Sequence, residues 1–248
     1  MLSKERMLVS DLDGTLIGDD ESLEQFNEWV QSCRNQLGLV YATGRFLLSI
    51  IEAVQTTALP APDIIISAVG TNIYHYPSNQ PQSDWHIHIN QNWNAKKIRN
   101  MFAALSELEL QPDEFQSEYK VSYYLRDATP EQLQSLHDEV TGASIESEMI
   151  YSSNRDLDFL PVRADKGKAA VFVASHWQIP AERVLVSGDT GNDRALFEHG
   201  FRGIVVGNAQ PELKNFTGPQ VYHARQSFAA GVLEGIKHWW NSEIPQKS

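Results

Sequence analysis

Three short apolar runs in the 248-residue chain end directly in polar turns. Residues 7–10 lead into Asp11, residues 37–41 lead into a Thr-Gly turn, and residues 183–187 lead into Gly188 and Asp189. Such runs are typical of buried strands, and a helical pattern follows each of them, so the sequence predicts a parallel α/β sheet. Because the carboxyl ends of parallel strands lie at one edge of a sheet, where ligands bind, these turns are the first place to look for a site.

The same alternation predicts the other elements on both sides of the chain's middle. A helix is expected from a cap at Ser22 to Ser32. The remaining helices are expected at residues 46–55, 166–176, 192–198, 210–215 and 228–240, and further strands at 63–67 and 203–206.

The rhythm changes after the turn-rich residues 77–81. Residues 82–161 are predicted to form a separate α+β insert, and residues 1–81 and 162–248 the core. Within the insert we expect strands at 85–89, 120–125, 144–151 and 156–160, and helices at 95–108 and 130–140.

Charge narrows the classes of possible partner, and cysteine content indicates the redox compartment. The chain has 20 lysines and arginines against 32 aspartates and glutamates, a net charge of -12, which disfavours nucleic acid and anionic membranes. Cys33 is the single cysteine, which suits a reducing cytoplasm. No signal peptide or membrane span is expected, and the polar residues 241–248 are expected to be a frayed tail.

Carboxylates dominate two of the strand-end turns. Asp11 and Asp13 precede Gly14, which permits a sharp turn, and Asp189 and Asp193 follow the strand at 183–187. Four carboxylates at one sheet edge would repel one another, so a divalent cation such as Mg²⁺ is predicted between them. Taken singly, each turn is equally compatible with an ordinary Asp-Gly turn or a capped polar loop.

Two further turns suit a phosphate group. Thr43 offers a hydroxyl and Gly44 allows close backbone approach, with Arg45 next in sequence. Lys166, at the start of a predicted helix, is a point charge suited to phosphate oxygens. In isolation, a glycine turn with a threonine cap and a solvated helix start would be the better explanations of these two motifs.

In order and spacing, these four motifs resemble those of the haloacid-dehalogenase superfamily in its phosphatase branch, and the insert resembles that superfamily's larger α+β cap. Residues 42–45, 68–74, 151–158 and 207–213 more narrowly resemble the sucrose-phosphatase family, which includes sucrose-6-phosphate and mannosylfructose-phosphate phosphatases. The resemblance implies a Rossmann-like parallel-sheet core with an inserted cap, and hydrolysis of a disaccharide phosphate. Tyr124 stands where the sucrose branch is expected to have histidine.

The resemblance also implies roles for individual residues. Asp11 would be the nucleophile that forms an aspartyl-phosphate, and Asp13 the general acid and base. Asp11, the Asp13 carbonyl, Asp189 and Asp193 would hold Mg²⁺. The phosphate and substrate contacts would be Thr43, Gly44, Arg45, Lys166 and Asn192.

On the predicted strand at 120–125, Lys120, Ser122 and Tyr124 alternate with apolar neighbours and would present one face to a sugar or to solvent. His86 and His88 would share another strand face, although a metal pair there lacks further ligands. Alternatives are a phosphatase of simpler hexose phosphates, a phosphosugar mutase, or a phosphate-regulated binding module. A glycosyltransferase partner is compatible with the phosphatase hypothesis.

Overall fold

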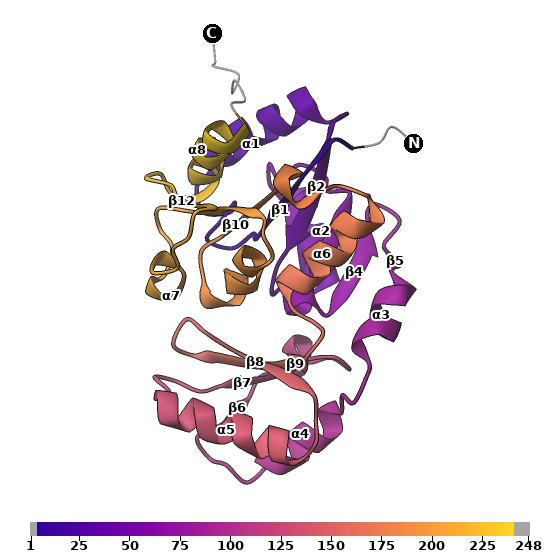
Figure 1. Cartoon of the computed structure of the whole chain (residues 1–248), viewed down its shortest axis with the longest axis vertical. Helices are drawn as coiled ribbons and strands as arrows, with labels where there is room; N and C mark the ends of the chain where they lie inside the picture. The colour runs from indigo at the N-terminus through magenta and orange to yellow at the C-terminus, as the bar shows by residue number, and fades with distance from the viewer. Residues whose placement is uncertain (1–3, 241–248) are drawn as a thin grey trace.

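The computed structural model describes residues 4–240 and contains two sheets that belong to different parts of the chain (Figure 1). The larger has eight strands in the order β12-β11-β10-β1-β2-β3-β4-β5. Its six strands from β12 to β3 are parallel, and β4 and β5 extend one edge in antiparallel pairing. The strands are β1 (Arg6–Ser10), β2 (Leu37–Ala42), β3 (Ile64–Ser67), β4 (Asn72–His75), β5 (Gln80–Pro81), β10 (Val184–Gly188), β11 (Arg202–Val205) and β12 (Val221–His223).

Register within this sheet fixes where the polar turns lie. Ser10 of β1 pairs with Tyr41 of β2 on one side and with Ser187 of β10 on the other. The turns that follow these three strands therefore leave the sheet at the same level. β1, β2 and β10 are almost wholly buried, because a parallel sheet is covered on both faces.

Helices complete this core, and their bounds are α1 (Asp20–Cys33), α2 (Leu47–Thr56), α3 (Ser83–Ile89), α6 (Lys166–His176), α7 (Pro211–Lys214) and α8 (Phe228–Trp240). Short 3-10 helices lie at η1 (Ala68–Gly70), η3 (Ala181–Arg183) and η4 (Gly191–Glu198). The helix expected at 192–198 is thus a 3-10 helix. α1 is capped by Asp19, whose carboxylate accepts from the Ser22 backbone N–H at 2.8 Å, so the predicted cap at Ser22 is wrong. Ser22 lies in the first turn, and its side chain is buried.

The insert has a four-stranded antiparallel sheet in the order β6-β7-β9-β8, which lies between its helices and the core (Figure 1). Its elements are α4 (Ala95–Phe102), β6 (Glu109–Leu110), η2 (Asp113–Phe115), β7 (Val121–Tyr124), α5 (Pro130–Gly142), β8 (Ser147–Ser152) and β9 (Asp156–Pro161). Buried side chains of the sheet and of both helices form a hydrophobic cluster separate from that of the core. A parallel α/β sheet with an inserted α+β domain is therefore confirmed.

The segment at 85–89 corrects the prediction, because it is the helix α3 and no strand. Trp85 and Ile89, four residues apart, are both buried and pack in the hydrophobic cluster of the larger domain. This spacing satisfies a helical period as well as an alternating one. The packing also places α3 with that domain, although the predicted insert starts at residue 82.

Other differences are small. α4 ends at Phe102 where a helix to 108 was expected, because Glu109 and Leu110 turn back to pair with β7. The short strands β4, β5, β6 and β12 were not predicted. The tail predicted at 241–248 lies outside the described residues, as do residues 1–3. Across residues 4–240, none of the helices combines the length and apolar character that a membrane crossing requires.

Candidate active site

Three carboxylates meet at the sheet edge where β1 and β10 end. Asp11 follows β1, and its backbone N–H donates to the Ser187 carbonyl at 3.1 Å. Asp189 and Asp193 come from the turn after β10. One oxygen of each carboxylate lies within 4.8 Å of the others, and all three side chains are buried. The sequence brings these three residues together as predicted.

Lys166, the first residue of α6, is enclosed within this cluster. Its Nζ donates to Asp11 Oδ1 at 2.8 Å, to Asp193 Oδ1 at 2.7 Å and to Asn192 Oδ1 at 2.7 Å, and the side chain is fully buried. Asp165 caps α6 by accepting from the Lys168 N–H at 2.6 Å, which fixes the helix end that carries Lys166. One ammonium group therefore balances only part of the negative charge.

Burial and the negative charge that Lys166 does not balance shift the pKa values of these groups. Burial raises the pKa of Asp11 to about 7, a rise that Lys166 opposes and Asp193 strengthens. Burial also raises the pKa of Asp189 to about 8, with Asp193 and Asp11 adding to the rise. Burial alone would lower the pKa of Lys166, but Asp11 and Asp193 outweigh it and raise the pKa.

The donor set of the cluster fits a hard divalent cation. Carboxylate oxygens are the ligands that Mg²⁺ prefers, and a divalent charge offsets the burial and the mutual repulsion that raise the pKa values of Asp11 and Asp189. Asp193 is the most constrained of the three. Its Oδ2 accepts from the backbone N–H groups of Asp189 at 2.9 Å and Thr190 at 3.0 Å, so it also holds the turn in shape.

Polar contacts that sequence reasoning missed hold the turn after β1 against the turns after β10 and β11. Thr15 donates from Oγ1 to Asp189 Oδ1 at 3.1 Å. Asn208 donates from Nδ2 to the Gly14 carbonyl at 2.7 Å and accepts from the Phe228 N–H at 2.9 Å. The sequence offered one signal for Thr15, namely its position directly after the Asp-Gly pair.

Gly14 is required where these turns meet. Its φ is +80°, in the left-handed region, and a Cβ there would lie 2.3 Å from Asp189 Oδ2. Any side chain would therefore displace the Asp189 carboxylate.

The Asp13 carboxylate lies apart from the other three, contrary to the expectation that all four converge. It is 54% exposed and is gripped by Arg45, whose Nε donates to Asp13 Oδ2 at 2.7 Å. This hydrogen bond raises the pKa of Arg45. Arg45, predicted to contact phosphate, thus contacts a carboxylate in this structure.

Thr43 and Gly44 lie at the end of β2, beside the cluster. Thr43 is buried, and its Oγ1 accepts from the Arg45 N–H at 3.2 Å. A Cβ on Gly44 would lie 4.0 Å from Asn192 Nδ2, so the turns after β2 and β10 face each other. The space between them is bounded by groups that suit an anion.

The insert presents one face of β7 to the core. Val121 and Tyr123 pack in the insert's own hydrophobic cluster, which leaves Lys120, Ser122 and Tyr124 on the opposite face. Lys120 Nζ lies 5.8 Å from the centroid of the Phe46 ring in the core.

Lys120 and Ser122 share a buried partner on β9 that sequence reasoning did not single out. Asp158 Oδ1 lies 3.3 Å from Lys120 Nζ and accepts from Ser122 Oγ at 2.6 Å. The guanidinium groups of Arg126 and Arg155 each lie 5.5 Å from the centroid of the Tyr124 ring. Lys120 is thus buried with a paired charge and does not lie on a solvated sheet face.

His86 and His88 do not form a pair, because α3 is a helix. His86 Nε2 is 2.9 Å from Asn72 Oδ1 and its ring stacks on Tyr119, whereas His88 stacks on Trp85. Both are accounted for by packing.

Comparison with known sequences identifies relatives along nearly the whole chain. The family described as Sucrose-6F-phosphate phosphohydrolase matches residues 4–240. Mannosylfructose-phosphate phosphatase of Agrobacterium fabrum is 34% identical over 239 residues, which cover 94% of this chain and 96% of that one. Sucrose-phosphatase 2 of Nicotiana tabacum is 33% identical over 94% of this chain, which spans 58% of the tobacco protein's length.

Solved structures agree with this result. The sucrose-phosphatase of Synechocystis, determined in complex with sucrose and phosphate, superposes with a TM-score of 0.90 at 34% identity, over 95% of this chain and 98% of that one. A sugar phosphatase of haloacid-dehalogenase subclass IIB superposes with a TM-score of 0.68 at 16% identity, over 95% of this chain and 99% of that one, and shares the fold.

Proposed function

Because this chain belongs to the Sucrose-6F-phosphate phosphohydrolase family, whose haloacid-dehalogenase fold it has, we propose that this sugar-phosphate phosphatase hydrolyses a disaccharide phosphate through an aspartyl-phosphate. The observation that carries the chemistry is the buried Asp11 carboxylate at the carboxyl end of β1, held by Lys166 at 2.8 Å.

Asp11 is the nucleophile in this proposal. Lys166 occupies its Oδ1, so Oδ2 attacks phosphorus and forms the acyl phosphate while the bond to the sugar oxygen breaks. Water then attacks phosphorus, releases phosphate and restores the Asp11 carboxylate. The ester is thus cleaved in two displacements, each easier than direct attack by water.

Asp13 moves the protons. It gives a proton to the departing sugar oxygen and takes one back from the water that attacks the intermediate. Its exposed carboxylate, two residues from Asp11 in sequence and facing Arg45, lies outside the buried cluster. Arg45 orients this carboxylate, and we propose that it also contacts the substrate's phosphate.

Mg²⁺ is the proposed cofactor, held by Asp11, Asp189 and the Asp13 backbone carbonyl with Asp193 beside them, and it would neutralise charge on the phosphoryl group. Thr43, Gly44, Lys166 and Asn192 surround the place where the phosphate oxygens would lie. The burial of these side chains supports their proposed roles. Lys166 and Asp193 are fully buried, whereas the Asp13 carboxylate is exposed.

The disaccharide is proposed from the relatives and from the insert. Relatives named for sucrose phosphate and mannosylfructose phosphate match 94% of this chain. Facing the catalytic core, the buried pair of Lys120 and Asp158 offers a donor and an acceptor to sugar hydroxyls. A wrong sugar would leave such buried groups unpaired, at a cost of about 1–3 kcal/mol each.

A phosphate-release screen tests this proposal. Purified protein with Mg²⁺ is given sucrose 6-phosphate, mannosylfructose 6-phosphate, fructose 6-phosphate and glucose 6-phosphate, and kcat/KM is compared. We expect one of the disaccharide phosphates to exceed both hexose phosphates by about tenfold or more, the worth of one to two sugar contacts. Equal or better hydrolysis of the hexose phosphates would refute the disaccharide assignment, and isomerisation without phosphate release would indicate a mutase.

A further inference from the structure

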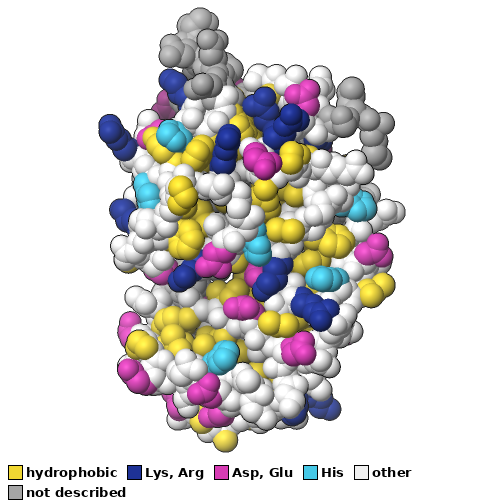
Figure 2. Space-filling view, viewed as in Figure 1, with side chains coloured by type: hydrophobic (Ala, Val, Ile, Leu, Met, Phe, Trp, Pro, Cys, Tyr) yellow, Lys and Arg dark blue, Asp and Glu magenta, His cyan; other side chains and the backbone are white. Residues whose placement is uncertain are grey.

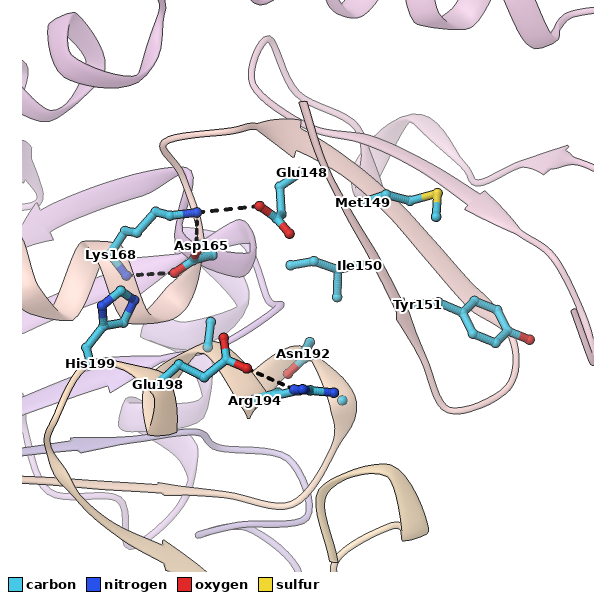
Figure 3. A pocket seen from close by; sticks show the side chains of 12 residues that line it. Glu148, Met149, Ile150, Tyr151, Asp165, Lys168, Asn192, Arg194, Glu198 and His199 are labelled. Carbon is cyan, nitrogen blue, oxygen red and sulfur yellow. Dashed lines mark hydrogen bonds and ion pairs between the residues drawn. The ribbon is translucent and has the colours of Figure 1, made fainter. Parts of the chain in front are cut away.

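A cleft of about 420 Å³ lies on the flank of the molecule, between strand β8 of the insert and the elements α6 and η4 of the catalytic core. In Figure 2, acidic and basic side chains alternate along the boundary between the two parts. Figure 3 shows the cleft from nearby, with Glu148 and Ile150 on one wall and Lys168, Arg194 and Glu198 on the other.

This cleft is distinct from the place where phosphate is proposed to bind. Asn192 is the residue common to both, and Asp11, Asp13, Thr43 and Asp189 are not among the residues that line it. The insert also touches the core next to the cleft, since a Cβ on Gly191 would lie 3.1 Å from the Tyr151 carbonyl and 3.6 Å from Ser152 Cβ.

The cations that line the cleft are already paired. Lys168 Nζ lies 2.7 Å from Asp165 and 3.5 Å from Glu148, so it joins the core to the insert. Arg194 Nε lies 2.9 Å from Glu198. With two cations against three carboxylates in the lining, the cleft does not attract a phosphate or another anion.

Neutral polyhydroxylated molecules fit this lining. Glu148 and Glu198 offer acceptors to hydroxyl groups, and the guanidinium of Arg194 retains donors beyond its bond to Glu198. Ile150 projects into the gap and, with Ala195, provides an apolar surface for the C–H face of a sugar ring. The volume lies within the range of small-molecule sites.

We propose that this cleft is a second, non-catalytic binding site for a neutral sugar. The ligand would contact β8 of the insert and η4 of the core together, and η4 continues directly from the turn that carries Asp189. A sugar bound there holds the insert against the core. Opening of the insert, and with it product release, becomes slower, so the sugar lowers kcat without competing for the active site.

The experiment uses sucrose as the probe and an aryl phosphate as the substrate of the full chain. It requires only phosphatase activity, so it is independent of which sugar phosphate the enzyme prefers. We expect sucrose to lower kcat for the aryl phosphate, in addition to any competitive effect on KM at the active site. Purely competitive inhibition, or no effect on kcat, would overturn the proposal.

Two variants and a matched control locate the effect. Glu198→Ala removes an exposed, ion-paired acceptor from the cleft, and Glu109→Ala removes an equivalent carboxylate paired with Arg126 elsewhere on the insert. Exposed pairs of this kind contribute little to stability, so both variants should fold. We expect the sucrose concentration for half-maximal loss of kcat to rise about tenfold in Glu198→Ala, and to stay unchanged in Glu109→Ala.

Ala195→Phe fills the cleft sterically and should abolish the effect on kcat while leaving the competitive effect. Because viscosity acts on all variants alike, an equal loss of kcat in wild type, Glu198→Ala and Ala195→Phe would show that sucrose acts on the solvent and would overturn the site.

Discussion

Lys166 has its ammonium group inside a ring of side-chain oxygens, 2.7 to 2.8 Å away, with no exposed surface. A buried cation is tolerated only when it is paired, and here the pairing is shared between the proposed nucleophile and Asp193. The same ammonium therefore holds the nucleophile in place and ties it to the turn after β10.

The first prediction concerns the nucleophile itself. Asp11→Asn should lower kcat by a factor on the order of 10³ or more, because an amide cannot attack phosphorus to form the intermediate. Phosphate release from the purified variant is the measurement, with thermal unfolding as the check that it is folded. Turnover near the wild-type rate would exclude Asp11 as nucleophile.

A second prediction follows from the raised pKa values in the cluster. An aspartate in an unfolded chain loses its proton at about pH 4, whereas Asp11 and Asp189 in the fold keep theirs until their pKa values of about 7 and about 8. Between these limits the folded, metal-free protein binds more protons than the unfolded chain. Its free energy of unfolding therefore falls as pH rises.

Thermal unfolding with and without Mg²⁺, from about pH 5 to about pH 8.5, checks this dependence. We expect the Tm of metal-free protein to fall over this range, and the stabilisation by Mg²⁺ to be largest at the alkaline end, where the metal competes with fewer protons. Asp189→Asn, which has no proton to lose there, should show a weaker fall. A metal-free Tm that rises with pH in wild type would contradict the assignment.

For single residues, the sequence predicts which side chains come together better than it predicts how each side chain is oriented. Asp11, Asp189 and Lys166 come together because strand ends and a helix start determine their positions. The carboxylate of Asp13 turns instead toward Arg45. Its orientation depends on side-chain torsions and on a neighbour that is distant in sequence. Asp158 was missed because its partners, Lys120 and Ser122, become visible only when β7 and β9 pair.

Among the elements, β7 was predicted well and α3 was not. Along β7, residues that pack in the insert's hydrophobic cluster alternate with residues on the opposite face, so its period of two is unambiguous. In α3 the five residues from Trp85 to Ile89 fit both periods, and burial against the catalytic core decides for a helix.

The polar face of β7 carries a prediction about specificity. Lys120→Ala should lower kcat/KM for the preferred disaccharide phosphate by about tenfold or more, and hardly change it for an aryl phosphate, which lacks the sugar. The variant also leaves Asp158 buried without its cation, so thermal unfolding must be measured beside the kinetics.

Lys97→Ala is the matched control for this experiment, because Lys97 donates to the Ala143 carbonyl on the exposed side of the insert. Lys97→Ala should leave kcat/KM unchanged for both substrates. If Lys120→Ala lowered kcat/KM equally for both substrates, its role would be structural.

Taken as a whole, the molecule binds an anion although its net charge is -12. The positive groups at the proposed phosphate site, Lys166 and Arg45, are each engaged by carboxylates of the chain itself. Long-range attraction therefore contributes little, and recognition depends on groups brought close at the sheet edge, including the proposed Mg²⁺.

The chain crosses between the catalytic core and the insert at two places that lie side by side. The Glu146 N–H donates to the Asn92 carbonyl at 3.1 Å, and the Glu146 carbonyl accepts from the Val162 N–H at 3.0 Å. Since the insert leaves and returns through one narrow junction and has its own hydrophobic cluster, it can be inherited, lost or exchanged as a module. With the insert as the proposed specificity element, such an exchange would change which molecule is recognised and leave the reaction centre unaltered.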